Sequence, residues 1–173
     1  GVGRGPVEAL AEYHSGLNRK MLAAGSGGLY NASSAGTAVL LNSGFTSSRW
    51  QWANFNAVMI LVNGADNPQI FNGTSLSNST ITGPNLTQVV GVNVFKHRLF
   101  LWEQNTQDFW YGGINAIGGA FVRFPLSRVS QLGGNLVAMG TWTLDAGDGM
   151  ADRAVFILSS GECVVYQGTD PGV

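Results

Sequence analysis

One phrase recurs four times along this chain. Each copy is an apolar run, a polar or glycine-rich turn, and a second apolar run that ends in Tyr or Phe. Runs of β-branched and aromatic residues interrupted by Asn, Gly, Asp and Ser are typical of β-hairpins. The hairpins are expected at residues 19–33, 57–73, 97–113 and 153–168. A chain that repeats a hairpin in this way is constrained to fold into repeated antiparallel sheets.

The aromatic residues that end the second runs set the period of the repeat. They are Tyr30, Phe71, Tyr111 and Tyr166, separated by 41, 40 and 55 residues. We expect these four residues to be the core aromatics that define the repeat, one in each unit. The last spacing is longer because residues 128–135 lengthen the link between units and residues 144–152 are inserted into the last unit.

Further candidate strands flank each hairpin. One precedes every hairpin, at residues 7–14, 50–56, 89–96 and 136–143, and another follows the first three, at residues 37–44, 79–83 and 120–127. The unit is therefore a four-stranded antiparallel meander, with approximate bounds 7–45, 49–83, 88–128 and 135–173. The last unit lacks a fourth strand. Open strand edges recruit other chains, so self-association through such edges is expected.

Repeated four-stranded units of this length are typical of a β-propeller, whose blades pack face to face around a central channel. We predict a single all-β repeat domain over residues 1–173, with about four propeller-like blades. Both ends of the sequence look cut, and the commonest closed rings have more blades. The chain is therefore expected to be excised from a longer one that forms a larger propeller. A β-sandwich or an irregular all-β domain is the alternative.

One stretch competes with the all-strand prediction. Residues 6–25 contain good helix formers, with Pro6 near a possible helix N-terminus. Gly16 interrupts this pattern, and the second half of the stretch fits the hairpin repeat. Strands are therefore favoured there.

Charge and cysteine content exclude several classes of partner. Charged residues are 11 % of the chain, against roughly 25 % in ordinary domains, and the net charge is −1. Nucleic acid is not an expected partner at this charge, and no apolar stretch approaches the ~20 residues that span a membrane. Cys163 is the only cysteine, so no intrachain disulfide is possible. Its apolar run, CVVY, predicts a buried small hydrophobe.

The candidate catalytic residues form no recognisable constellation. His14 and His97 end or precede strands and are expected to be ordinary exposed residues. Glycoside hydrolysis needs paired carboxylates, whereas the glutamates are scattered across the repeats. They are Glu8, Glu12, Glu103 and Glu162. We predict a protein that is not an enzyme and binds no cofactor.

The loop TLDAGDGMAD is the one candidate metal site. Asp145, Asp148 and Asp152 offer hard oxygen ligands on a glycine-rich turn, which suits Ca²⁺ in principle. Their spacing does not match an EF-hand, and the stretch imitates the sialidase Asp-box only in part. Solvated turn acids are the favoured interpretation, so no metal is predicted.

The tryptophans leave two interpretations open. All five fall inside strand patterns, which favours packing between blades over a sugar-binding face. They are Trp50, Trp52, Trp102, Trp110 and Trp142.

Several longer phrases resemble a family of virion structural proteins of tailed phages and bacterial prophages. They are LAEYHSGLNRKMLAA, GVNVFKHRLFLWE, NAIGGAFVRFPLSRVSQLGG and MGTWTLDAGDGMADRAVFILSSGECVVYQGTDPG. The resemblance covers the chain from Glu8 to Gly172, and members look longer at both ends. It implies a particle component, at the head–tail junction or in the tail, and it transfers no catalytic residues.

Together these observations predict a non-enzymatic structural and protein-interaction component of a phage or prophage particle. It would be located in the virion, be assembled in the bacterial cytoplasm, and bind other virion proteins. A carbohydrate-binding receptor module is the first alternative, and its mark would be tryptophans exposed together on one face. A propeller-type glycoside hydrolase is the second, and it would need converging carboxylates.

Overall fold

The computed structural model describes residues 5–145 and 150–172. Regular structure in this part of the chain is strand, apart from two short 3₁₀ helices, η1 (Leu86–Gln88) and η2 (Leu126–Arg128). The predicted all-β class is confirmed, and the stretch with helix formers folds as two paired strands, β1 (Ala9–Ser15) and β2 (Asn18–Gly25). Across the described residues, no helix has the length and apolarity to cross a membrane.

The strands form four principal sheets, each ordered along the chain with antiparallel neighbours. Sheet 1 contains β1, β2, β3 (Gly28–Asn31) and β4 (Val39–Ser43). Sheet 2 contains β5 (Gln51–Phe55), β6 (Val58–Val62), β7 (Gln69–Phe71) and β8 (Leu76–Asn78). Sheet 3 contains β10 (Val89–Phe95), β11 (Arg98–Glu103), β12 (Asp108–Tyr111) and β14 (Val122–Pro125). Sheet 4 contains β15 (Leu136–Asp145), β16 (Met150–Leu158) and β17 (Cys163–Tyr166).

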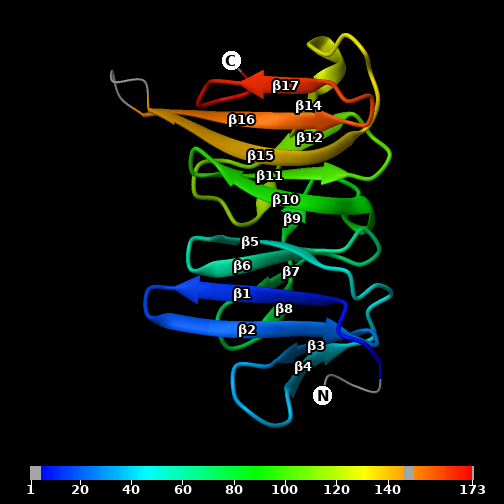
Figure 1. Cartoon of the computed structure of the whole chain (residues 1–173), viewed down its shortest axis with the longest axis vertical. Helices are drawn as coiled ribbons and strands as arrows, with labels where there is room; N and C mark the ends of the chain where they lie inside the picture. Colours follow the sequence, from blue (N-terminus) through cyan, green and yellow to red (C-terminus); the bar gives the residue numbers. More distant parts are fainter. Residues whose placement is uncertain (1–4, 146–149, 173) are drawn as a thin grey trace.

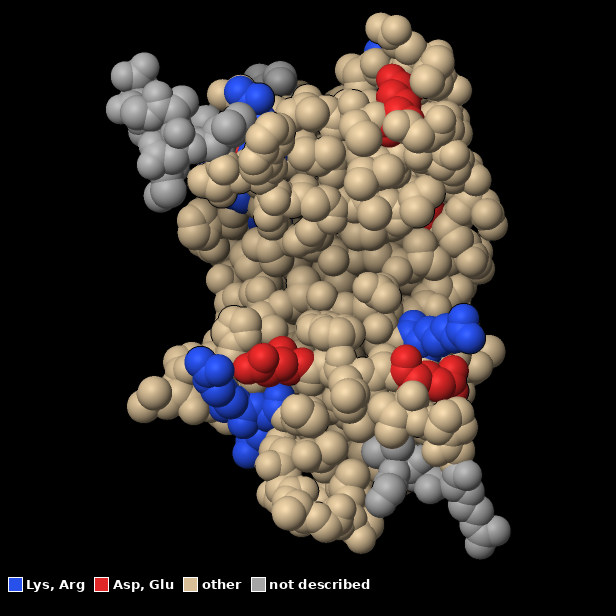
Figure 2. All heavy atoms as spheres, in the orientation of Figure 1, with Lys and Arg blue, Asp and Glu red and all other residues tan. Residues whose placement is uncertain are grey.

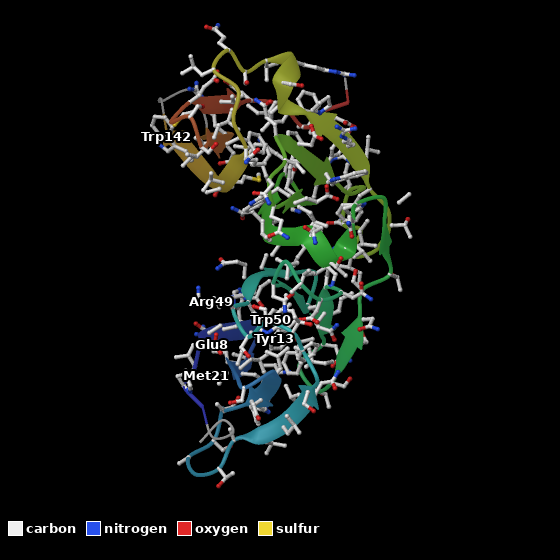
Figure 3. The ribbon with its side chains drawn as sticks, turned by 90° about the vertical axis from the view of Figure 1, so that its right-hand side faces the viewer. Glu8, Tyr13, Met21, Arg49, Trp50 and Trp142 are labelled. Atoms are coloured by element: carbon white, nitrogen blue, oxygen red, sulfur yellow. The ribbon has the colours of Figure 1, made fainter. Side chains whose placement is uncertain are left out.

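The four sheets are stacked in chain order along the long axis of the molecule (Figure 1). Sheet 1 lies at one end and sheet 4 at the other, so the described sheets do not meet in a ring. Seen from the side, the stack follows an arc, with the first strand of each sheet toward the inner side (Figure 3). The first strands of neighbouring sheets contact one another, because β5 touches both β1 and β10, and β10 touches β15. The inner side of the arc is therefore lined by edge strands.

Tight turns between first and second strands repeat with the same period as the sheets. They occupy residues 16–17, 56–57 and 96–97, forty residues apart. The first residue of each turn has a positive φ, 57° at Gly16, 48° at Asn56 and 47° at Lys96. Two-residue turns with this geometry match the right-handed twist of the strands that they join. The local turn chemistry therefore produces the repeat of hairpins.

The predicted fourth strand of the second unit, residues 79–83, is wrong. The strand that pairs with β7 is β8 (Leu76–Asn78), directly after a turn at Asn72. The side chain of Asn72 accepts hydrogen bonds from the backbone N–H groups of Thr74 and Ser75, at 3.0 and 2.9 Å, and closes the hairpin early. The later residues instead form β9 (Ile81–Thr82), which pairs in parallel with β13 (Gly119–Ala120) and links the second unit to the third.

Hydrophobic side chains fill each junction between neighbouring sheets. Tyr13, Leu22 and Phe71 belong to the cluster between sheets 1 and 2, and Ile60 and Leu101 to the cluster between sheets 2 and 3. Burying a side chain of this size contributes about 1.5–3 kcal/mol. Because each cluster draws on two units, the sheets stabilise one another across the junctions.

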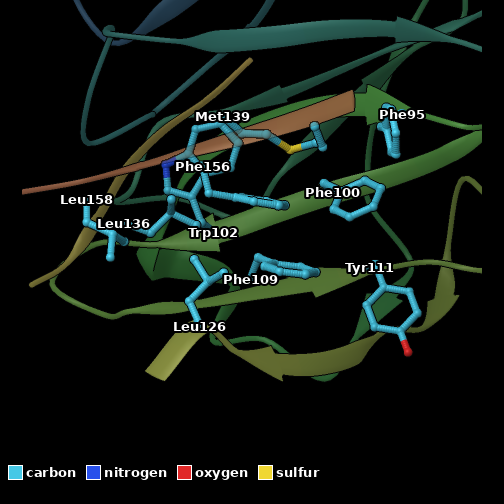
Figure 4. Close-up of a cluster of buried hydrophobic side chains, with 11 residues drawn as sticks. Phe95, Phe100, Trp102, Phe109, Tyr111, Leu126, Leu136, Met139, Phe156 and Leu158 are labelled. Carbon is cyan, nitrogen blue, oxygen red and sulfur yellow. The ribbon is translucent and has the colours of Figure 1, made fainter. Parts of the chain in front are cut away.

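The junction between sheets 3 and 4 is rich in aromatic rings (Figure 4). Phe109 stacks on Phe156 with ring centroids 4.6 Å apart and an interplanar angle of 7°. On its other side Phe109 stacks on Phe124 at 5.0 Å. This stack connects the last described sheet to the rest of the molecule.

Candidate functional site

A groove opens on the inner side of the arc, where the first strands of three sheets come together. We call it the inner groove, and its volume is about 500 Å³. Its lining residues come from β5, β10, β11 and β15: Gln51, Trp52, Val90, Val92, Asn93, Trp102, Val137, Ala138 and Met139.

Gly91 determines how Trp102, a lining residue of the inner groove, packs. It pairs with Trp102 across β10 and β11, next to an irregularity in the register between Val89 and Gly91. A Cβ atom on Gly91 would lie 2.0 Å from the indole carbons of Trp102, so only glycine leaves room for this ring. Trp102 is accordingly buried, and it forms part of the wall of the groove.

Amide side chains give the inner groove its polar groups. The Nδ2 atom of Asn93 donates to the carbonyl oxygen of Met139 at 2.8 Å, which connects sheet 3 to sheet 4. Gln51 is exposed, and Trp52 beside it exposes 37 % of its surface. The described residues that line the groove carry no titratable side chain. Such a lining suits binding by ring contact and hydrogen bonding rather than proton transfer.

Three acids at or after the ends of the second strands bind the backbone of the linkers between sheets. They are Asp66, Glu103 and Glu162, and each accepts hydrogen bonds from the linker that enters its own sheet. The donors are the N–H groups of Thr46 and Ser47 for Asp66, Asn85 for Glu103, and Gln131 and Leu132 for Glu162. The repeat thus includes a structural carboxylate that the sequence did not reveal.

Asp66 has the most elaborate of these contacts. Its Oδ2 atom accepts from the Nδ2 atom of Asn63 at 2.7 Å and from the N–H of Thr46 at 2.8 Å. Burial raises the pKa of Asp66, but the hydrogen bonds from Asn63, Thr46 and Ser47 outweigh it and hold the pKa below its ordinary value. The ionised carboxylate therefore fastens the linker between sheets 1 and 2.

The candidate glutamates do not come together. Glu12 pairs with Arg19 at 3.3 Å on an exposed part of sheet 1, and Glu8 lies 3.8 Å from Arg49. Glu103 and Glu162 bind their linkers on sheets 3 and 4. Charged side chains cover a small part of the face in Figure 2. The structure thus brings no two of these four carboxylates into one site.

The two histidines lie in sheets 1 and 3. His14 is exposed in β1, where its Nδ1 atom lies 3.2 Å from the Nδ2 atom of Asn54 on β5. His97 is exposed in the turn before β11, with φ at 57°. Neither lines the inner groove.

The candidate metal ligands fall partly outside the described residues. Asp148 lies outside them, and so does the side chain of Asp145, whose backbone ends β15. Asp152 accepts a hydrogen bond from Thr143 at 2.8 Å and lies 4.0 Å from the ammonium of Lys96. Within the described part, no three His, Cys, Asp or Glu side chains gather as metal ligands.

The four aromatics of the repeat occupy unequal positions. Phe71 and Tyr111 are buried, whereas Tyr30 and Tyr166 are half-buried. Phe71 faces sheet 1, while Tyr111 and Tyr166 approach one cluster from opposite sides, sheets 3 and 4. In sheet 3 the aromatic residue that packs toward sheet 2 is therefore not Tyr111 but its neighbour Trp110.

Arg98 connects this pair of tyrosines to the last described residues. Its guanidinium donates to the Oδ2 atom of Asp170 at 2.9 Å, and to the carbonyl oxygens of Gly112 and Thr169 at 3.0 and 3.2 Å. Burial raises the pKa of Tyr111 and of Tyr166, and the charge of Asp170 adds to this effect while Arg98 opposes it. Residues 167–172 are thereby fixed against sheet 3.

The predicted burial of the tryptophans and of Cys163 is correct only in part. Trp50 and Trp102 are buried between sheets and Trp110 is half-buried there, as expected. Trp52 and Trp142 are exposed by 37 and 52 %, so the packing prediction is wrong for these two. Cys163 is exposed as well, because it lies on the outward face of the last described strand. The prediction of a buried cysteine is therefore wrong.

Gln51 and Asn93 are groove residues that sequence reasoning did not single out. Each lies in the first strand of its sheet, close to an aromatic or β-branched residue. An amide in such a strand is unusual, and this is the signal that could have identified them.

No model of a known protein family matches the sequence, and no curated protein matches it either. Residue roles in this chain therefore follow from its own geometry.

Proposed function

We propose that this chain is a non-enzymatic structural and protein-binding component of a phage or prophage particle, in the tail or at the head–tail junction. Its sheets serve as blades of a larger propeller-like assembly, and its partners are other virion proteins. It is assembled in the bacterial cytoplasm and functions in the virion. The phrases that resemble phage virion proteins support this assignment. The observation that carries it is the apolar outer face on each end of the stack.

The outer face of sheet 1 exposes apolar side chains. Leu10, Met21 and Leu40 are 53, 48 and 52 % exposed. The pairing register puts them on one side of the sheet, beside the exposed Glu12–Arg19 ion pair and opposite Leu22 and Leu29, which pack against sheet 2. Apolar side chains gathered on one sheet face mark a surface that binds another protein.

The outer face of sheet 4 has the same character at the other end of the arc. Ile157 and Val165 are 41 and 50 % exposed. They lie opposite Phe156 and Val164, which pack against sheet 3. Figure 3 places Met21 and Trp142, from the two end sheets, far apart on the arc. Two apolar end faces suit a subunit with neighbours on both sides.

Genetic complementation tests the proposed function. The coding sequence is deleted from the prophage that carries it, and the protein or a variant is supplied from a plasmid. We expect the deletion to give incomplete particles by electron microscopy, and the wild-type protein to restore them. Leu10→Glu should fail to restore them, whereas Leu17→Glu, the same change at a fully exposed residue of the β1–β2 turn, should succeed. Unchanged particle yield, morphology and infectivity after the deletion would overturn the proposal.

The inner groove favours carbohydrate binding as a second candidate. Trp52 offers exposed ring surface near the amides of Gln51 and Asn93 in the groove that Trp102 also lines, a combination that suits sugar hydroxyls and C–H faces. Neutral oligosaccharides would be titrated while tryptophan fluorescence is recorded. A saturable change that Trp52→Ala abolishes would support this candidate, and no change with any oligosaccharide would remove it. The hydrolase alternative has no such support, because the four glutamates lie apart.

A further inference from the structure

The sequence contains two Asn-Gly pairs, Asn63-Gly64 and Asn72-Gly73, and both lie between strands of sheet 2. An asparagine followed by glycine is prone to deamidation, because glycine has no side chain to hinder attack of its backbone nitrogen on the asparagine amide. The two pairs share this chemistry but differ in their contacts, so the fold decides which of them reacts.

Both reacting groups of the first pair are held by hydrogen bonds. The N–H of Gly64 donates to the carbonyl oxygen of Val89 at 2.8 Å, which opposes loss of its proton. The Nδ2 atom of Asn63 donates to the carbonyl oxygen of Ser47 and to the Oδ2 atom of Asp66, at 2.8 and 2.7 Å. Loss of this nitrogen would break both hydrogen bonds and put a second carboxylate beside Asp66. Deamidation of Asn63 is therefore opposed by the fold.

The second pair has different contacts. Asn72 is exposed and begins the turn between β7 and β8. Its Oδ1 atom accepts hydrogen bonds from the N–H groups of Thr74 and Ser75, at 3.0 and 2.9 Å. Within the described part of the chain, the N–H of Gly73 donates to no backbone oxygen. Gly73 is buried, and solvent reaches the pair through the exposed side chain of Asn72.

The hydrogen bonds to Oδ1 favour attack on the side-chain amide of Asn72. This oxygen gains negative charge when a nucleophile adds to the Cγ atom. Donors about 2.7–3.1 Å from such an oxygen stabilise the tetrahedral intermediate, as in an oxyanion hole. The turn thus activates the amide of Asn72, whereas the contacts of Asn63 and Gly64 hold both reacting groups in place.

We propose that Asn72 is a site of spontaneous deamidation and that the fold selects it over Asn63. The backbone nitrogen of Gly73 gives its proton to hydroxide and forms a bond to the Cγ atom of Asn72. The bond between Cγ and Nδ2 then breaks, and the departing nitrogen takes a proton from water and leaves as ammonia. Water opens the resulting succinimide at either carbonyl group, which leaves aspartate or isoaspartate at position 72. The solvent supplies every co-reactant, and no oxidation or reduction occurs.

The two products differ in their effect on the contact between sheets 1 and 2. The hydroxyl of Tyr13 donates to the carbonyl oxygen of Asn72 at 3.3 Å, and a Cβ atom on Gly73 would lie 2.9 Å from the ring of Tyr13. Aspartate keeps an oxygen that accepts from the turn. Isoaspartate adds a methylene group to the backbone, which displaces the turn from Tyr13 and loosens β8. This modification goes beyond the proposed virion role and does not depend on it.

Peptide mass spectrometry of the aged protein tests the inference. The whole folded protein is incubated at mildly alkaline pH and digested under acidic conditions, and both Asn-Gly peptides are quantified with their aspartyl and isoaspartyl forms. We expect deamidation of Asn72 to be at least about tenfold faster than that of Asn63. Equal rates, or faster reaction at Asn63, would overturn the inference.

The same incubation in concentrated urea is the matched control, because it keeps the sequence and removes the folded contacts. The two pairs should then react at similar rates. A preference for Asn72 that persists unchanged in urea would contradict selection by the fold. Reaction of both pairs in urea, with no reaction at Asn72 in the folded protein, would also overturn the inference.

Amide hydrogen exchange tests the effect on the sheet. Exchange in β8, residues 76–78, should rise as the wild-type protein ages, and Asn72→Gln should suppress this rise. Asn42→Gln is the control variant, because Asn42 is exposed in β4 and is followed by Ser43 rather than by glycine. An equal rise in aged Asn72→Gln would contradict the assignment of the loosening to Asn72.

Discussion

The indole ring of Trp102 lies so close over Gly91, its partner on the neighbouring strand, that a Cβ atom there would fall 2.0 Å from two ring carbons. Because the φ angle of Gly91 is not in the left-handed region, the requirement for glycine comes from space alone. This contact fixes one wall of the inner groove.

Gly91→Ala is expected to destabilise the protein by about 1–3 kcal/mol, because the indole must move or the strands must separate. Urea denaturation measures the loss, and tryptophan fluorescence reports the displaced ring. Gly140→Ala is the matched control, since Gly140 also lies in a first strand but has no atom within 4 Å of the added methyl. Equal losses for both variants would contradict the packing described for Trp102.

Phe156→Ala is expected to cost about 3–5 kcal/mol of unfolding free energy, because it removes a buried ring from the stack with Phe109. Ile157→Ala, one residue further along β16, should cost below about 1 kcal/mol, because Ile157 is 41 % exposed. Chemical denaturation of both variants checks the difference. A larger loss for Ile157→Ala would mean that sheet 4 packs through its other face.

Asp66→Asn is expected to lower the free energy of unfolding by about 1–2 kcal/mol near pH 7, because neutral Asn accepts hydrogen bonds less strongly than the carboxylate. The folded pKa of Asp66 is lowered, so its stabilising contribution is present above the unfolded pKa of about 3.9 and is lost as the pH falls through the folded pKa. The difference in unfolding free energy between the wild type and Asp66→Asn should therefore become smaller below about pH 4.

Glu12→Gln serves as the control for Asp66, because Glu12 forms only an exposed ion pair with Arg19. Glu12→Gln should change the free energy of unfolding by less than about 1 kcal/mol. Thermal or urea denaturation between acidic and neutral pH measures both variants. If Asp66→Asn lowered the unfolding free energy by the same amount at every pH, the charge of the Asp66 carboxylate would not stabilise the linker.

Arg98→Gln is expected to release residues 167–172, because the guanidinium supplies the ion pair with Asp170 and the hydrogen bond to Thr169. Amide hydrogen exchange in this segment should rise about tenfold or more. Arg123→Gln is the control, because Arg123 pairs with Asp108 on the exposed side of β14. Unchanged exchange in Arg98→Gln would show that other contacts fix the segment.

The hairpins could be predicted because their signals are local. Turn residues such as Gly16 and Asn56, and alternating apolar runs on either side, specify strand pairing within about twenty residues. The fourth strand of the second unit was misplaced because the side chain of Asn72 closes the turn early, a choice that composition does not distinguish. The pattern of apolar and turn residues therefore predicted the hairpins, but it did not place every fourth strand correctly.

The candidate sites could not be predicted because they depend on contacts between units. Trp52 and Trp102 are fifty residues apart in sequence and line the same groove only because the first strands lie on one side of the arc. Asp66 looks like an ordinary turn acid until the linker from sheet 1 is seen to bind it. The roles of these residues depend on contacts between sheets, which the sequence of a single unit does not specify.

Mass spectrometry of gradient-purified particles tests the central proposal most directly. After induction of the prophage that encodes the chain, peptides such as the one around DFWYGG are quantified against the major capsid protein. The account predicts their recovery in intact particles at a fixed ratio, which also gives the copy number. Peptides present in the lysate but absent from intact particles would contradict a structural role in the virion.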